Sequence, residues 1–436
     1  MLDDILNALR ARADLQGWTV RHITVRGAQL YAVPTTVEAR RVVASERYVV
    51  DVLRHAPGPN GEPTCGSGNA TLLPGDDIGK ALDAAALMAG LVHNPLYTIP
   101  APAELPEIAL VDAGLQASSA ATLDDVFARL KTAASRYPHV RLTAAECFGE
   151  EQVTHLRSSR GMHATQSATH IQFEWVLASR KDDREVESFV EMSRRRVADL
   201  DLEAEVERQA QYAADLLVAT PPPAYSGPVV LRGSTLATFM NGGVLQTLGS
   251  GASKFSKVTP WEIGHSIFRR EVAGDSLTVW ANRRLPYGTH ANRFDDEGLP
   301  AQRIALIRDN QLVTFTASQR YADYLSIPPT GASGDVELPA GITPAAALIA
   351  EPHVEVVAFS WFNPDGVTGE FASEIRLGYV VNGDKRTPFK GGMLVGNVLD
   401  ALADVRWSAE TGFYGDYQGP TTARFAQLTV AGEKQV

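Results

Sequence analysis

The side chains best suited to chemistry in this sequence are its ten histidines and two cysteines. The closest group of histidines is His155, His163 and His170, whose spacing is irregular and whose neighbours alternate with period two. That pattern places them on strands and loops, where surface or hydrogen-bonded histidines are more common than metal ligands. The sequence also lacks HExxH, GxSxG, Walker and paired CxxC patterns, so none of the standard hydrolase or phosphate-binding sites is indicated.

A second stretch with chemical potential combines Trp261, Glu262 and His265. A carboxylate and an imidazole three residues apart could share acid–base work on a substrate. A Trp-Glu-x-x-His stretch is more often a packed loop, however. We therefore keep these three residues only as candidates for the lining of a cleft.

The composition is that of an ordinary globular protein of several domains, because 436 residues are too many for one compact core. The net charge of −11 disfavours direct contact with nucleic acid or anionic lipid. No run of about 18 apolar residues predicts a membrane-spanning helix, and the acidic N-terminus is unlike a signal peptide. Cys65 and Cys147 form no CxxC pair, so the sequence predicts a reducing compartment and a cytoplasmic location.

The first half of the chain predicts mixed helices and strands. An amphipathic helix covers residues 2–9, and alternating apolar residues after it predict a meander of short strands. Residues 58–70 are rich in turn-forming residues and predict a loop. Thr122 and Asp125 resemble a capping box, which would open a helix that ends at Pro138.

Two segments divide the chain into predicted domains. Residues 100–107 have the composition of a linker, and three consecutive prolines in residues 220–228 mark the strongest boundary. The predicted domains are an N-terminal α+β domain (1–105), a central α+β segment that packs with it (106–222) and a β-rich C-terminal domain (228–436). The predicted fold class is α+β, in which an antiparallel sheet with helices precedes a β-rich domain.

Turns in the second half follow one another in a distinctive order. They are Asp295 to Pro300, the hairpin signal Asp309-Asn310, Thr368 to Ala372, the hairpin signal Asn382 to Asp384, and the helix start Gly396-Asn397. This succession resembles the C-terminal domain of the TldD/PmbA family. The acid-rich helix start at Asp199 to Asp201 and the boundary before Pro228 fit as well, so the resemblance covers nearly the whole chain.

The resemblance implies that a zinc site has been lost. In the TldD branch the two histidines of HExxxH and a later cysteine hold zinc, and the glutamate of the motif takes a proton from the metal-bound water. The matching positions here are Asn241, Gly242, Gln246 and Tyr414. Amide oxygens are poor zinc ligands, and glycine supplies no general base. For the amide positions, a degenerate site facing a cavity and an ordinary helical turn remain equally open, and Tyr414 is more often a packed aromatic.

Three functions remain open at this point. The resemblance to the TldE/PmbA branch favours a non-catalytic subunit that binds no cofactor itself. Its partner would be a TldD-like zinc-bearing subunit, or a second copy of this chain, and its substrate would be a peptide. The alternatives are a stand-alone hydrolase with substituted active-site residues in a specialised biosynthetic pathway, and a peptide-binding module without turnover.

Overall fold

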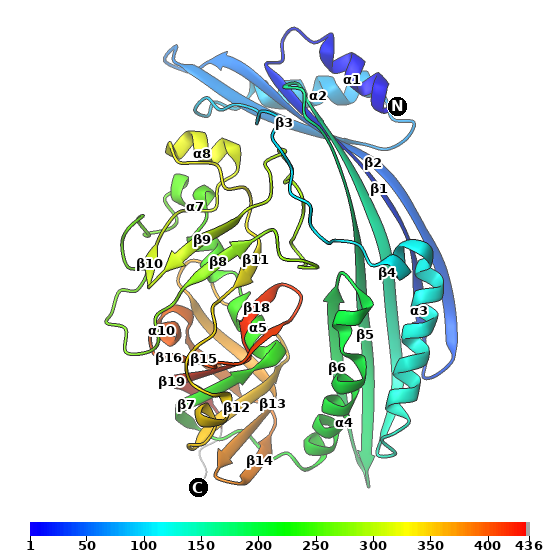
Figure 1. Cartoon of the computed structure of the whole chain (residues 1–436), viewed down its shortest axis with the longest axis vertical. Coiled ribbons are helices and arrows are strands. Elements are labelled where there is room, and N and C mark those ends of the chain that lie inside the picture. Colours follow the sequence, from blue (N-terminus) through cyan, green and yellow to red (C-terminus); the bar gives the residue numbers. More distant parts are fainter. Residues whose placement is uncertain (433–436) are drawn as a thin grey trace.

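The first half of the molecule is one long, curved antiparallel sheet (Figure 1). The computed structural model describes residues 1–432, so the last four residues of the predicted 228–436 domain lie outside the described range. The six strands follow the order β3-β2-β1-β4-β5-β6. Their bounds are β1 (Gly17–Ala32), β2 (Val37–Pro57), β3 (Pro63–Leu72), β4 (Val140–Ser158), β5 (His163–Lys181) and β6 (Arg184–Arg194). Pairing of β1 with β4 joins the segments that the sequence divides near residue 105.

These strands are longer than the predicted meander, so the prediction of short strands was wrong. Each end of these long strands lies under a different pair of helices. The helices α1 (Leu2–Arg10) and α2 (Ile78–Gly90) cover one end, where Val20 and Val50 are fully buried. The helices α3 (Ala113–Ala134) and α4 (Leu202–Val218) cover the other end, over Phe173 and Trp175.

The prediction of a loop at residues 58–70 is right only for residues 58–62, which form a turn, since residues 63–72 form the edge strand β3. Its glycines serve helix packing rather than turns. A Cβ atom on Gly66 or Gly68 would collide with the backbone carbonyls of Ala89 and Ala85 on α2. The strand can therefore lie directly against the helix backbone, and this non-local contact leaves no strand-like alternation in the sequence.

The helix expected to open at Thr122 begins earlier, at Ala113, because Asp112 caps it. The Asp112 carboxylate accepts hydrogen bonds from the backbone N–H groups of Gly114 (2.8 Å) and Leu115 (3.1 Å). Ser118 then departs from helical geometry, with φ −163° and ψ 96°. The predicted start thus lies just beyond a kink inside a longer helix.

The second half contains a closed ring of strands and a second sheet. The ring runs β12-β7-β19-β15-β13 and closes through the pairing of β12 with β13. The strand β14 also pairs with β13. The second sheet runs β10-β9-β8-β11-β18-β17. The ring strands, with β14 and the short β16, are β7 (Tyr225–Arg232), β12 (His353–Phe359), β13 (Glu370–Asn382), β14 (Lys385–Phe389), β15 (Met393–Asn397), β16 (Val405–Trp407) and β19 (Thr422–Ala431). The second sheet comprises β8 (Val279–Asn282), β9 (Arg303–Arg308), β10 (Gln311–Leu312), β11 (Asp335–Glu337), β17 (Thr411–Phe413) and β18 (Tyr417–Pro420).

Short helices connect these strands, and one large apolar core fills the space between ring and sheet. They are α5 (Gly233–Met240), α6 (Val244–Leu248), α7 (Gly251–Phe255), α8 (Gln319–Leu325), α9 (Ala345–Leu348) and α10 (Val398–Ala403). The predicted α+β class, with a β-rich second half, is confirmed. Within residues 1–432 no helix is both long and apolar enough to cross a membrane.

Three local predictions in the second half are confirmed. Asp309 and Asn310 both adopt positive φ (48° and 68°) in the two-residue turn between β9 and β10. Gly383 and the following residue turn β13 into β14, where Asn382 pairs with Lys385. Asn397 caps α10 by accepting a hydrogen bond from the N–H of Leu399 (3.0 Å).

The two halves meet where the edge strand β6 reaches a loop of the second half. Arg195, just beyond β6, donates hydrogen bonds to the backbone carbonyls of Gly288 (2.6 Å), Thr289 (2.9 Å) and Ala291 (2.7 Å). Arg293 returns the contact by donating to the carbonyl of Thr165 on β5 (3.0 Å). Residues 288–293 are therefore held against the sheet by charged donors on both sides.

We predict that Arg195→Ala lowers the free energy of unfolding by about 3 kcal/mol, because three carbonyls lose a charged donor. Urea denaturation followed by circular dichroism measures the change. Arg308→Ala is the matched control, since Arg308 is exposed on β9 and should change stability by less than about 0.5 kcal/mol. Equal effects of the two variants would contradict the role given to Arg195.

Candidate functional site

The helix that should carry the zinc-binding motif is interrupted at the aligned positions. The helix α5 ends at Met240, and Asn241 is its C-terminal capping residue. Gly243 follows with φ +90°, a left-handed conformation that glycine adopts readily, and α6 then begins at Val244. The aligned positions Asn241, Gly242 and Gln246 thus lie on two short helices and the turn between them.

Gly242 occupies a packed position. A Cβ atom there would lie 2.8 Å from Phe362 and 2.8 Å from Pro364. The Phe362 ring also packs against Phe239 of α5, with ring centroids 5.4 Å apart. The space in which a glutamate side chain would reach a metal-bound water is therefore filled by the segment that follows β12.

The two amide side chains are held inside the protein. The Nδ2 atom of Asn241 and the Oε1 atom of Gln246 are buried and have no hydrogen-bond partner among residues 1–432. Gln246 lines a small cavity with Leu306 and Trp280. Neither amide carries the charge or the softness that zinc prefers in its ligands.

Tyr414 lies at the other end of α5. Its ring is 3.7 Å from where a Cβ atom on Gly233 would be, at the first residue of the helix. An eight-residue helix is about 12 Å long, so the ring and Asn241 are at opposite ends. The structure does not bring the four aligned positions together around one point.

The residues present therefore do not fit a zinc ion at this place. In the described range no group of three or more His, Cys, Asp or Glu side chains is arranged to hold a metal. Within residues 1–432 no hydrogen bond joins the three histidines considered first. His155 bonds Thr165 (2.9 Å), His170 bonds Ser193 (2.7 Å) and His163 is exposed.

The Trp261, Glu262 and His265 stretch forms a surface loop. Trp261 is only 4% exposed and belongs to the core of the second half. Glu262 and His265 are exposed, and the Glu262 carboxylate forms an ion pair with Lys254. Among residues 1–432 the Glu262 carboxylate is thus paired with Lys254 rather than with His265.

Sequence reasoning missed a pair that the fold assembles where the two halves meet. The Nδ1 atom of His290 is 3.2 Å from the Oδ1 atom of Asp335, which also accepts the backbone N–H of His290 (2.8 Å). Asp335 is completely buried at the start of β11, whereas the His290 side chain is 58% exposed. The hydrogen bond that the His290 ring donates to Asp335 raises the pKa of His290 above its ordinary value.

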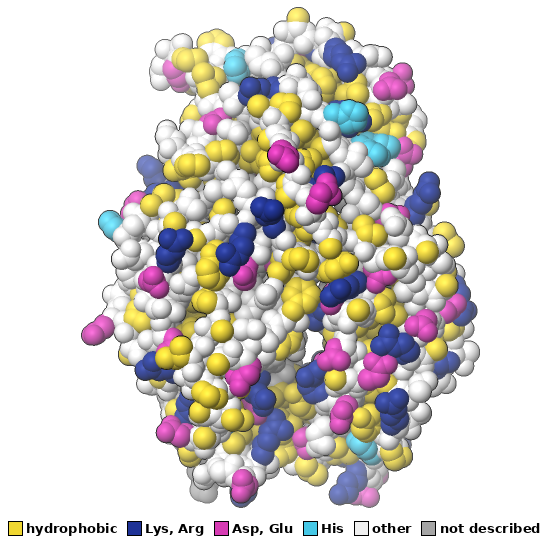
Figure 2. All heavy atoms as spheres, in the orientation of Figure 1, with side chains coloured by type: hydrophobic (Ala, Val, Ile, Leu, Met, Phe, Trp, Pro, Cys, Tyr) yellow, Lys and Arg dark blue, Asp and Glu magenta, His cyan; other side chains and the backbone are white. Residues whose placement is uncertain are grey.

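Charged groups from both halves lie within electrostatic range of this pair. Burial raises the pKa of Asp416, which lies between β17 and β18 within electrostatic range of His290 and Arg194. Burial likewise raises the pKa of Tyr414. We call His290, Asp335, Asp416, Arg194 and Tyr414 the seam cluster. Figure 2 shows the surface open between the second half and the side of the sheet that carries α4.

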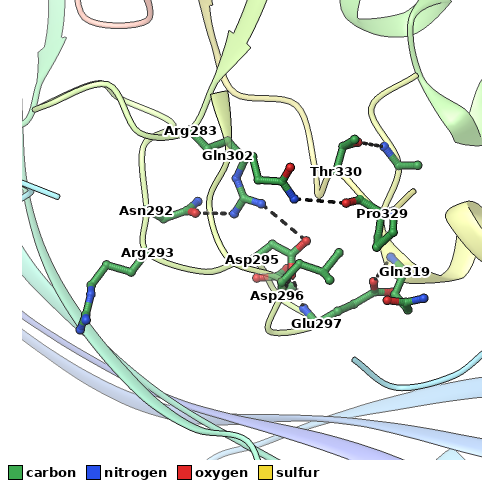
Figure 3. Close-up of polar contacts among 12 residues, drawn as sticks. Arg283, Asn292, Arg293, Asp295, Asp296, Glu297, Gln302, Gln319, Pro329 and Thr330 are labelled. Atoms are coloured by element: carbon green, nitrogen blue, oxygen red, sulfur yellow. Dashed lines mark hydrogen bonds and ion pairs between the residues drawn. The ribbon is translucent and has the colours of Figure 1, made fainter. Parts of the chain in front are cut away.

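A second buried polar cluster explains the Asp295 to Pro300 turn. Arg283 is only 2% exposed, and its guanidinium lies between Asn292 and Asp295 (Figure 3). The distance from its Nη1 atom to the Asp295 carboxylate is 3.5 Å. The Asp295 carboxylate also accepts the N–H groups of Glu297 and Leu299. Burial raises the pKa of Glu297 to about 7, while its side chain accepts a hydrogen bond from the Gln319 backbone. These contacts are directed inward, so they shape the turn.

The protein is thus an α+β protein with a long curved sheet and a closed ring of strands. Its described residues include no cluster of side chains arranged to hold a metal. Residues 225–432 match the PmbA/TldA metallopeptidase C-terminal domain. Residues 225–432 thus carry the C-terminal domain of the TldD/PmbA family. An uncharacterized protein of Methanocaldococcus jannaschii is 24% identical over 195 residues, which is 41% of this chain and 45% of that protein. The match thus spans less than half of that relative.

Solved structures match the fold over nearly its whole length. TldE from Thermococcus kodakarensis has a TM-score of 0.82 at 16% identity, covering 99% of this chain and 100% of that one. A candidate modulator of a DNA gyrase from Thermotoga maritima has a TM-score of 0.83 at 16% identity, with the same coverage. A candidate modulator of DNA gyrase from Bacteroides thetaiotaomicron has a TM-score of 0.78 at 14% identity, covering 99% and 97%. At such identities the likeness concerns the fold.

The packing of Gly242 predicts that Gly242→Ala lowers the free energy of unfolding by about 1–2 kcal/mol, because the new methyl group collides with Phe362 and Pro364. Denaturant titration measures the change. The matched control is Gly79→Ala in α2, where the nearest atom, on Asp77, is 3.4 Å from the added Cβ. Alanine favours helices over glycine by up to about 1 kcal/mol, so the control should be neutral or stabilising. An unaffected Gly242→Ala variant would show that the position is open.

The burial of Glu297 predicts a fall in stability as pH rises. Its folded pKa, about 7, lies above the ordinary 4.5, so the unfolded state ionises first. The stabilisation is complete below pH 4.5 and is lost by about pH 7, with a maximum of about 3 kcal/mol. Glu297→Gln should remove this loss, so its stability advantage over the parent protein should grow across that window in urea titrations. Glu104→Gln, at an exposed position, should show no such growth.

Proposed function

We propose that this chain is the non-catalytic partner of a TldD-like zinc metallopeptidase subunit and helps to bind and enclose peptides that the partner cleaves. One observation carries the proposal: at none of the four positions that match the zinc site is there a side chain able to bind zinc or to take a proton from its water. Gly242 supplies no base, Asn241 and Gln246 are neutral amides, and Tyr414 replaces a thiolate. Zinc would then be held by the partner alone.

The packing of these positions supports the proposal. If only the zinc ligands had changed, an open pocket would remain beside α5. Instead Phe362 and Pro364 fill the space next to Gly242, at distances that leave no room for a side chain. A subunit whose own catalytic pocket is closed still offers the surfaces of the family fold for assembly and for substrate contact.

A free sheet edge supports a role in peptide binding. The strand β17 ends the second sheet, and within residues 1–432 it pairs only with β18. An extended peptide could add to such an edge through main-chain hydrogen bonds, which select for unfolded segments rather than for a sequence. The strand leads directly into Tyr414, where an aromatic face and a hydroxyl are available to a bound peptide.

The partner would be a TldD-like subunit in a heterodimer, and a homodimer would use the same surfaces. We place the complex in the cytoplasm, because both cysteines, Cys65 and Cys147, are free and buried. A module that binds peptides without turnover would use the same β17 edge. It differs in needing no zinc-bearing subunit, which makes the two functions separable by experiment.

The test is co-expression with the HExxxH-bearing relative encoded by the same organism. We expect a stable complex in size-exclusion chromatography with about one zinc per pair by elemental mass spectrometry, and almost none on this chain alone. The complex should cleave an unstructured fluorogenic peptide, and cleavage should disappear when the partner's motif glutamate is changed to glutamine. Neither subunit alone should cleave at a comparable rate.

Two results would overturn the proposal. A chain that purifies with about one tightly held zinc of its own would place a metal site here. Full peptidase activity of the partner without this chain would remove its role in the complex. Tight peptide binding by this chain alone, measured by fluorescence anisotropy with no recruitment of the partner, would favour the binding module.

A further inference from the structure

The His290–Asp335 pair has the geometry of a proton-transfer site. Asp335 is fully buried, and its Oδ1 atom receives both the backbone N–H and the ring Nδ1 of His290. These two bonds fix the position and the orientation of the imidazole. A carboxylate that bonds Nδ1 also places the ring proton on that nitrogen and leaves Nε2 as the basic atom.

The opposite side of the imidazole is free to meet a ligand. The Nε2 atom of His290 has no hydrogen-bond partner within the described part of the chain, and 58% of the side chain is exposed. The second oxygen of Asp335, Oδ2, is buried without a partner. Gly288 approaches this oxygen so closely that a Cβ atom there would collide with it. A buried, under-bonded carboxylate behind an exposed imidazole is costly for stability and is typical of functional sites.

Charges on neighbouring elements favour the protonated imidazole. Asp335 on β11 and Asp416 between β17 and β18 both raise the pKa of His290, whereas Arg195 beyond β6 lowers it. Arg194 faces Asp416 from β6, and Tyr414 lies within electrostatic range of Arg194. The site therefore combines a base, two carboxylates and cationic groups from both halves of the molecule.

The origin of Asp335 in the sequence sets this site apart from the lost zinc position. Asp335 belongs to the passage 322–341, which contains none of the four positions aligned with the zinc site. The passage contributes β11, which inserts between β8 and β18 and brings the carboxylate beneath His290. The site is assembled from residues that the zinc motif does not involve.

We propose that, apart from the zinc-dependent peptide cleavage in which this chain is non-catalytic, His290 and Asp335 form a metal-independent acid–base dyad that activates water against acyl esters bound at the seam cluster. The Nε2 atom takes a proton from water as the water oxygen bonds to the carbonyl carbon. The imidazolium, stabilised by Asp335, then gives that proton to the oxygen of the departing alcohol as its bond to carbon breaks. Water and the ester yield an acid and an alcohol, and the dyad returns to its starting state.

The probe is 4-nitrophenyl acetate, whose hydrolysis to acetate and 4-nitrophenol is followed by absorbance. The full chain is used alone, with a chelator and without any zinc-bearing partner. We expect a protein-dependent rate that rises with pH to a plateau, with its inflection above the ordinary imidazole value of about 6.5. His290→Gln should lower the plateau rate at least about tenfold. His55→Gln, at an exposed position on β2, should leave it unchanged.

The carboxylate variants separate a catalytic dyad from a structural contact. Asp335→Asn and Asp416→Asn should each move the inflection to lower pH, by about half a unit or more for Asp335. If the Asp335→Asn variant does not fold, the shift of the inflection in the Asp416→Asn variant alone tests the proposal. An unchanged rate in His290→Gln, or an inflection that neither carboxylate variant moves, would overturn the proposal. Because no partner is present, this outcome is independent of the test for the heterodimer.

Discussion

The Arg195 guanidinium is one of the contacts that join the two halves of the molecule, and the position of the loop at residues 288–291 depends on it. It binds three carbonyls of the loop at residues 288–291 and so fixes that loop against the end of β6. The same loop carries His290, whose partner Asp335 lies on a strand of the second sheet. One cation thus positions a loop between two sheets, and the loop positions an imidazole. A guanidinium is suited to this because its planar donors satisfy several carbonyls at once.

The polar groups around this junction are costly to bury, which argues that they select a particular arrangement rather than add net stability. Arg283 and Asp295 form an ion pair in which both side chains are almost fully buried, and two nitrogens of Arg283 lack hydrogen-bond partners among the described residues. Apolar replacements of similar volume often stabilise a protein as well as such a pair does. Its directional bonds instead hold the Asp295 turn, next to the loop that reaches the sheet.

Local signals in the sequence predicted local structure well. The Asp309-Asn310 turn and the Asn397 cap need only a few neighbouring residues, and both are confirmed. The strand β3 was missed because its glycines are required by close packing against a helix some twenty residues away, and such packing leaves no alternation of apolar residues in the sequence. The seam cluster was missed for the same reason, since His290 and Asp335 lie 45 residues apart and meet only through the pairing of β11 with β8. Burial of a carboxylate is not visible in a sequence.

The two places considered for function differ in accessibility, and this difference bears on how the chain works. Beside α5 the aligned positions are closed, because Phe362 and Pro364 lie where a catalytic side chain would extend. At the seam an imidazole is exposed, a carboxylate is buried behind it, and groups from both halves converge. A ligand bound there would touch both halves, so its binding energy would couple to their relative position. Any assembly or closure of the family fold that moves one half against the other would then act on His290 directly, through the loop that Arg195 holds.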